Sequence, residues 1–170
     1  MASSAISEIA TERLRLRDFA VRDARPLQEV LARPGVGDWF YKTTGESLAT
    51  LWGRGMSSWG RLSRRYTVTK RGDDRLIGHI RLGADGRLTF VIDPQHWGRG
   101  LATEAVGAVI AQAEPLGSDN PIKAAVFDAN EGSRRVLEKL GFAPVKHTFM
   151  QPLGRSTMAP ATVYARPRSA

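Results

Sequence analysis

The segment that most constrains the fold runs from Leu88 to Gln112, where the sequence changes from one periodicity to another. Residues 88–92 (LTFVI) form an apolar run typical of a buried strand, and residues 101–112 have the pattern of an amphipathic helix. Gly98 and Gly100 lie between them and can adopt conformations that other residues avoid. A strand, a glycine turn and a helix N-terminus present free N–H groups and the positive end of a helix dipole. The segment therefore predicts a ligand that carries phosphate.

Two common phosphate loops do not fit this segment. A P-loop requires Lys and then Ser or Thr directly after its second glycine, whereas Leu101 and Ala102 follow Gly100. A dinucleotide fingerprint requires a glycine or alanine three residues after that glycine, where this chain has Thr103. An ordinary tight turn without a ligand remains an alternative at this point, because short glycine motifs are common.

A second strand and helix follow about thirty residues later. Residues 123–128 read as a short buried strand, and Asn130 is a good N-cap for the helix after it, while Ser133 can also bond to free amides. Gly141 is placed to end that helix. The apolar face of the helix consists of Val136, Leu137 and Leu140.

Together these motifs resemble the GNAT superfamily of acyl-CoA N-acyltransferases. The resemblance depends on Gln95-x-x-Gly98-x-Gly100 and on Asn130-x-x-Ser133 followed by EKLGF at 138–142. Residues 97–105 and 133–142 are most similar to the Rim-type branch, which acetylates ribosomal-protein N-termini, as is TERLRLR at 11–17. The similarity extends from about residue 11 to about residue 166, so we expect a single domain over residues 1–170.

The remaining pattern predicts an α+β fold. Strands are expected at 14–17, 66–70, 76–82, 88–92, 123–128 and 162–166, with helices at 21–31, 101–112 and after Asn130. Residues 39–61 have a mixed helical pattern interrupted by glycines. The order of elements predicts a mostly antiparallel twisted sheet with helices on both faces. The resemblance adds that the fourth and fifth strands, here 88–92 and 123–128, splay apart.

Composition excludes several classes of site and leaves the partner open. The chain has no Cys, and His79, His96 and His147 share no ligand spacing, so no metal site is expected. No apolar stretch approaches the length of a membrane span, and MASSA at the start lacks the features of a secretory signal, so a cytoplasmic protein is expected. The net charge of +8 comes from basic residues scattered along the chain, a distribution typical of a solvated surface. The same charge would also attract an anionic cofactor or a ribonucleoprotein. Nucleic acid is not expected as a direct ligand, and the oligomeric state stays open, with a dimer as one possibility.

The resemblance implies acetyl-CoA as co-substrate and assigns residues to it. The pantetheine arm would bond to the backbone of the fourth strand, at Phe90, Val91 and Ile92. Gln95 would brace the turn, and Asn130 would contribute to cofactor binding. The pyrophosphate would meet the amides of Gly98, Arg99, Gly100, Leu101, Ala102 and Thr103.

The implied reaction is direct attack of an amine on the thioester, which needs a proton for the departing thiolate. Many members of the family supply it from a Tyr at the position of Leu137, and in the Rim-type branch a Ser at the position of Ser133 stands in. Ser133 is therefore the catalytic candidate, with a second helix cap as the alternative. The general base is undecided among Asp85, Asp93, His79 and none, because residues 88–92 carry no carboxylate.

The predicted function is acetyl-CoA-dependent N-acetylation of a primary amine, on a protein N-terminus or a small molecule. One alternative is a module that binds coenzyme A with little catalysis, since both the strand carboxylate and the acid Tyr are missing. A less favoured alternative is a basic protein associated with RNA or the ribosome.

Overall fold

The computed structural model describes residues 8–40, 63–113, 120–153 and 155–167, so the pattern at 39–61 lies almost entirely outside the described residues. The strands are β1 (Ile9–Ala10), β2 (Leu14–Asp18), β3 (Arg64–Lys70), β4 (Leu76–Leu82), β5 (Leu88–Ile92), β6 (Ile122–Phe127), β7 (Ala143–Met150) and β8 (Ala159–Arg166). The α-helices are α1 (Ala24–Leu31), α3 (Leu101–Ala113) and α4 (Glu131–Lys139). Short 3₁₀ helices lie at Val21–Asp23, Gly37–Trp39 and Pro94–His96.

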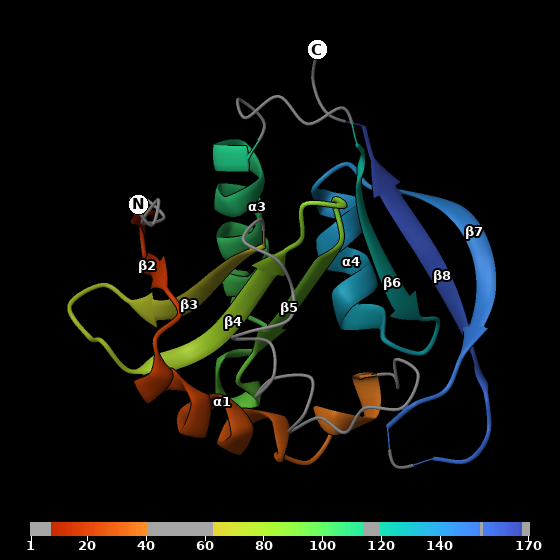
Figure 1. The fold of residues 1–170 in the computed structure, drawn as a ribbon, viewed down its shortest axis with the longest axis horizontal. Helices are drawn as coiled ribbons and strands as arrows, with labels where there is room; N and C mark the ends of the chain where they lie inside the picture. The colour runs from red at the N-terminus through yellow and green to blue at the C-terminus, as the bar shows by residue number, and fades with distance from the viewer. Residues whose placement is uncertain (1–7, 41–62, 114–119, 154, 168–170) are drawn as a thin grey trace.

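The strands form two antiparallel sheets that lie side by side in Figure 1. The first has the order β1-β2-β3-β4-β5 and the second the order β6-β8-β7. β5 and β6 meet only near their starts, where Arg87 and Lys123 form a parallel bridge and the Lys123 N–H donates to the Gly86 carbonyl at 2.9 Å. A side chain at Gly86 would overlap the Pro121 carbonyl, so the glycine permits this close approach. Beyond the bridge the strands separate, which confirms the predicted splay.

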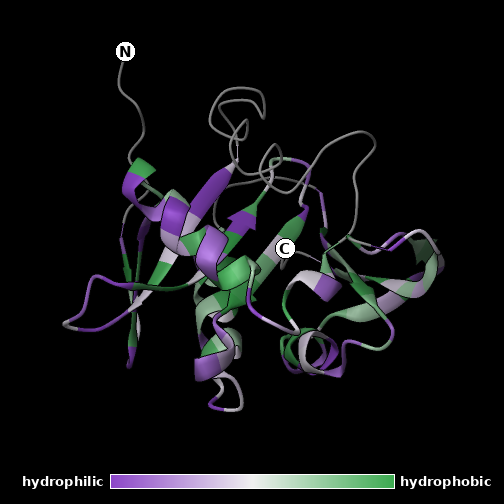
Figure 2. Ribbon diagram, turned by 90° about the horizontal axis from the view of Figure 1, so that it is seen from below, coloured by the Kyte–Doolittle hydropathy of each residue, from purple (hydrophilic) through white to green (hydrophobic). Residues whose placement is uncertain are grey.

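Helices cover both faces of the five-stranded sheet, as predicted. On one face α3 buries Ala105, Val106 and Val109 in the main core, against side chains of β2, β3 and β4. On the other face, Leu27, Val30 and Leu31 of α1 pack with Val91 in a smaller cluster. Figure 2 shows hydrophobic and hydrophilic stretches on both the strands and the helices of this layer. No helix in the described ranges is both long and apolar enough to cross a membrane.

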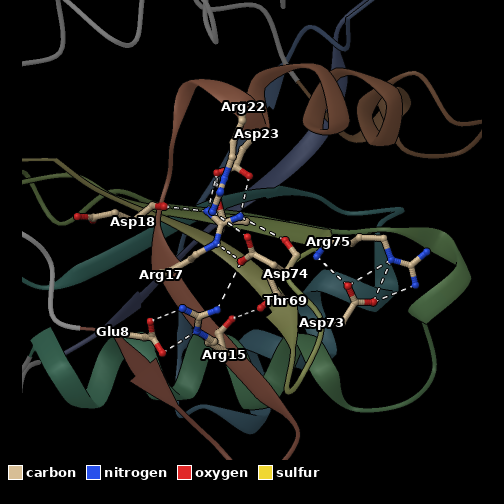
Figure 3. Close-up of polar contacts among 11 residues, drawn as sticks. Glu8, Arg15, Arg17, Asp18, Arg22, Asp23, Thr69, Asp73, Asp74 and Arg75 are labelled. Carbon is tan, nitrogen blue, oxygen red and sulfur yellow. Dashed lines mark hydrogen bonds and ion pairs between the residues drawn. The ribbon is translucent and has the colours of Figure 1, made fainter.

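A buried ion pair fixes the start of α1 on the sheet (Figure 3). Arg17 of β2 donates two hydrogen bonds to the Asp23 carboxylate at 2.8 and 2.9 Å and one to the Asp74 carboxylate at 2.6 Å. Burial opposes ionisation of Asp23, but bonds from Arg17, Ala20 and Thr67 outweigh it and hold its pKa below the ordinary value. The pair thereby positions α1 and the segment that follows it.

Apart from small differences in their bounds, the sequence-based elements agree with the structure except at the start of one helix and at two strands. The predicted helix at 21–31 starts as a 3₁₀ turn and becomes α-helical at Ala24. Two strands were not predicted, the short β1 and the eight-residue β7. β7 is an edge strand whose residues are mostly exposed, with Val145 and Phe149 59% and 63% exposed. Its sequence therefore lacks the alternation of buried and exposed residues that marks a strand.

Candidate active site

The gap between β5 and β6 opens into a cavity of about 630 Å³, within the range of small-molecule sites. Its walls are β5, the start of α3, the facing half of β6 and one side of α4. The segment after α1 closes one end. The cavity exists because the two strands pair at Arg87 and nowhere further along. The predicted site residues that line it are Phe90, Val91, Ile92, Gly98, Gly100, Leu101, Ala102, Thr103, Asn130 and Ser133.

The loop before α3 has the geometry of an anion receptor. Gly98 and Gly100 have φ values of +72° and +73°, which lie in the left-handed region that favours glycine. Among the described residues, none accepts a hydrogen bond from the backbone amides of residues 98–103. Five of these six residues, all except Arg99, line the cavity at the N-terminus of a thirteen-residue helix. The structure thus provides an electropositive cradle where the sequence predicts one.

Gln95 and Arg99 are placed differently from the rest of this loop. Both are exposed, and neither is among the described residues that line the cavity. The Gln95 N–H donates to the Asp93 side chain at 3.0 Å. The Arg99 carbonyl points outward and accepts a bond from Arg13 at 2.9 Å. Their predicted roles therefore depend on backbone groups rather than on side chains that face the cavity.

β5 offers backbone groups to the cavity at alternate residues. Gly83 donates to the Arg87 carbonyl at 2.9 Å and Asp93 to the Ile77 carbonyl at 2.8 Å, so residues 87 and 93 face β4. Hydrogen-bonding direction alternates along an antiparallel strand, so Val91 also faces β4, whereas Phe90 and Ile92 direct their N–H and C=O groups toward the cavity. The Ile92 carbonyl accepts from Trp97 Nε1 at 2.7 Å, which holds that indole at the cavity wall.

The first turn of α4 forms the wall opposite the glycine loop. Asn130 Oδ1 accepts a bond from the Ser133 N–H at 3.1 Å, which confirms Asn130 as the N-cap. Ser133 lines the cavity, and its hydroxyl has no bonding partner among the described residues. Gly141, with φ +80°, ends the helix as expected.

Several lining residues were not predicted from the sequence. Arg135 and Lys139 are one turn apart on the side of α4 that faces the cavity, so the i, i+4 spacing of two basic residues was the available signal. Val36, Trp39 and Phe40 close the far end. The Phe40 carbonyl accepts a bond from the Leu153 N–H at 2.7 Å, which ties the end of this segment to the loop after β7. No local motif marks these three residues.

The candidate bases lie outside the cavity lining. Asp85 is in an exposed turn and pairs with Arg87, while Asp93 caps the 3₁₀ turn and pairs with Arg33 at 3.3 Å. His79 is 1% exposed and packs edge-on against Phe19. Burial and then the charge of Arg65 lower the pKa of His79 to about 3, so it is neutral at pH 7 and a weak base. The described residues also contain no cluster of three potential metal ligands.

Known proteins similar to this chain point to one family. A family model described as "Acetyltransferase (GNAT) domain" matches residues 13–143. RimJ of Mycobacterium smegmatis, solved with a CoA disulfide, superposes with a TM-score of 0.76 at 16% identity, over 97% of this chain and 88% of that one. Spermidine N-acetyltransferase of Vibrio cholerae, solved with CoA and spermine, gives a TM-score of 0.75 at 17% identity, over 93% and 97%. At these identities the superpositions show a shared fold.

Curated relatives match over shorter stretches. The probable N-acetyltransferase YjcK of Bacillus subtilis is 42% identical over 84 residues, which are 45% of this chain and 46% of YjcK. The chain thus spans less than half the length of the curated relatives it matches, at 29%, 46% and 48%. The family model, in contrast, covers the glycine loop, the splayed strands and α4 in one match. The chain therefore belongs to the GNAT acetyltransferase domain family.

Proposed function

We propose that the protein is an acetyl-CoA-dependent N-acetyltransferase that transfers an acetyl group to a primary amine. The observation that supports this most strongly is the row of backbone amides at 98–103, which have no acceptor among the described residues. All of these residues except Arg99 line the splayed cavity. Such a row of donors at a helix N-terminus suits a ligand with several negatively charged oxygens. Family membership makes acetyl-CoA the expected source of those oxygens.

The cavity offers binding groups for three parts of coenzyme A: the pyrophosphate, the pantetheine arm and the 3′-phosphate. Amides of Gly98 to Thr103 would hold the pyrophosphate, and the backbone of Phe90 and Ile92 would bond to the amides of the pantetheine arm. Arg135 and Lys139 supply positive charge on the opposite wall, where the 3′-phosphate could bind. The side chains of Gln95 and Arg99 are not needed for this arrangement.

When bound, acetyl-CoA supplies a thioester that an amine can attack directly. The protein must then hold the amine neutral and deliver a proton to the leaving sulfur. Ser133 is placed for the second task, because the residue lines the cavity and its backbone N–H is already bonded to Asn130. The hydroxyl is therefore not used as a cap among the described residues, which favours the acid role over the capping alternative.

The acceptor end of the cavity favours an amine of low positive charge. Its described wall contains the aromatic residues Trp39 and Phe40, and Glu131 is the single carboxylate among the described lining residues. Glu131 is already paired with Arg135 at 3.2 Å. A polyamine would need free carboxylates for its further charges. An N-terminal α-amine, with a pKa near 8, also needs less help from a base than a lysine near 10.4.

Thiol release from acetyl-CoA tests the proposal. The panel would contain N-terminal peptides, a peptide with an internal lysine, spermidine and a buffer blank. We expect release that depends on the N-terminal peptides and is weak with spermidine. Coenzyme A binding without release on any amine would support the alternative of a binding module. Salt-sensitive RNA binding without affinity for coenzyme A would support the alternative of an RNA-associated protein.

A further inference from the structure

One arginine connects the N-terminal strand to the phosphate-binding loop. Arg13 Nε donates to Glu104 Oε2 at 2.7 Å, and Nη1 donates to the Arg99 carbonyl at 2.9 Å. The Arg13 N–H and the Thr11 hydroxyl donate to Glu104 Oε1 at 3.0 and 2.5 Å. We call Thr11, Arg13, Glu104 and the Arg99 carbonyl the Arg13 latch. The latch joins residues that are 86 to 93 positions apart in the sequence.

The latch sets the direction of a peptide group in the glycine loop. The C=O of residue 99 and the N–H of Gly100 belong to one trans peptide and point in opposite directions. Because the carbonyl is bonded to Arg13, the Gly100 N–H is turned away from Arg13. Gly100 itself lines the cavity, so this orientation makes its N–H available to a phosphate.

The latch also neutralises a charge that would oppose anion binding. Glu104 lies in the first turn of α3, whose N-terminus forms the cradle. A carboxylate there interacts favourably with the helix dipole but repels a phosphate at the same helix end. Burial opposes its ionisation, but bonds from Thr11 and Arg13 keep the pKa of Glu104 below its ordinary value. Glu104 is thus ionised at pH 7, and Arg13 supplies the compensating charge at 2.6 Å.

We propose that Arg13 is a positioning residue for the phosphates of the cofactor, which orients the peptide between Arg99 and Gly100 and cancels the charge of Glu104. The proposal rests on the proposed function, since it requires that the cradle binds coenzyme A. Arg13 acts through the loop and through Glu104, and its own guanidinium is occupied by these two partners. Arg13 thus affects the affinity for the cofactor, and other residues carry out the chemical step.

Calorimetric titration of CoA into variants tests the proposal. Arg13→Ala should raise the Kd by about tenfold, because it removes the bond to the loop and leaves Glu104 uncompensated. The double variant Arg13→Ala/Glu104→Gln should recover the part of this loss that comes from the charge of Glu104, whereas the part that comes from the lost bond to the Arg99 carbonyl should remain. Arg15→Ala is the matched control, because Arg15 lies two residues along and pairs with Glu8 and Asp74, away from the loop (Figure 3). Its Kd should equal that of the wild type.

Two further measurements, the steady-state kinetics and the salt dependence, distinguish this role from a purely structural one. In turnover, Arg13→Ala should raise KM for acetyl-CoA and leave kcat within about twofold, whereas general loss of fold would lower kcat. The difference from wild type should also shrink as salt is raised, because screening weakens the repulsion. A variant with Kd equal to wild type, or a double variant as weak as Arg13→Ala, would overturn the proposal. If Arg13→Ala does not fold, Arg13→Gln takes its place in the same tests. Wild-type protein that does not bind CoA would contradict the proposed function instead.

Discussion

Gly98→Glu should abolish cofactor binding while leaving the fold intact. Gly98 has φ +72° and no described atom within 4 Å of the Cβ it lacks, so a side chain there has room but is strained. Left-handed backbone at a residue other than glycine costs about 1–3 kcal/mol. A carboxylate ~5 Å from a phosphate in a medium of effective dielectric ~20 adds about 3 kcal/mol of repulsion. That repulsion corresponds to a Kd for CoA raised about 100-fold or more.

The matched control is Gly72→Glu, in the turn between β3 and β4. Gly72 has φ +78° and also no described atom within 4 Å of its missing Cβ, so it carries the same strain and the same added charge away from the cavity. Melting temperatures of the two variants should fall together, by about 2–4 °C per kcal/mol of strain. Calorimetry should show CoA binding lost in Gly98→Glu and kept in Gly72→Glu. Equal CoA affinity in the two variants would refute the assignment of the glycine loop to the phosphates.

Three other variants test separate residues. Ser133→Ala should lower kcat about 10- to 1000-fold with KM for acetyl-CoA nearly unchanged, and steady-state kinetics showing an unaltered kcat would end its role as the acid. Lys139→Glu should weaken CoA about tenfold but affect dephospho-CoA much less, and equal losses in paired titrations would remove Lys139 from the 3′-phosphate. For His79, the folded-state pKa of about 3 lies below the ordinary 6.5, so the unfolded state alone takes up a proton as pH falls. The free energy of unfolding should therefore drop by about 2 kcal/mol between pH 7 and pH 5, and denaturant titrations of His79→Gln should show a flatter pH dependence.

The cofactor half of the site could be predicted from the sequence because it depends on local backbone requirements. Gly98 and Gly100 mark left-handed conformations, and Asn130 marks a helix start, whatever the rest of the chain does. The prediction that β5 and β6 splay apart came from the resemblance to the family. The strands pair only through the bridge between Arg87 and Lys123, and such a tertiary contact cannot be read from a local pattern.

The acceptor half could not be predicted in the same way. Val36, Trp39 and Phe40 reach the cavity because the Arg17–Asp23 pair fixes α1 and a bond to Leu153 closes the other side. Phe40 and Leu153 lie far apart in the sequence, and although Arg17 and Asp23 are only six residues apart, no motif marks them as a pair. His79 is the reverse case. Its place on an alternating strand left a catalytic role open, and its burial, its lowered pKa and its position outside the cavity lining argue against that role.

The central claim is that an amine attacks acetyl-CoA directly while both are bound in the cavity. Initial rates of thiol release, measured over a grid of acetyl-CoA and N-terminal peptide concentrations, test it most directly. The account predicts amine-dependent release with intersecting double-reciprocal lines, and no acetylated protein when acetyl-CoA is added alone. Parallel lines with an acetylated side chain, or tight CoA binding with no amine-dependent release, would contradict it.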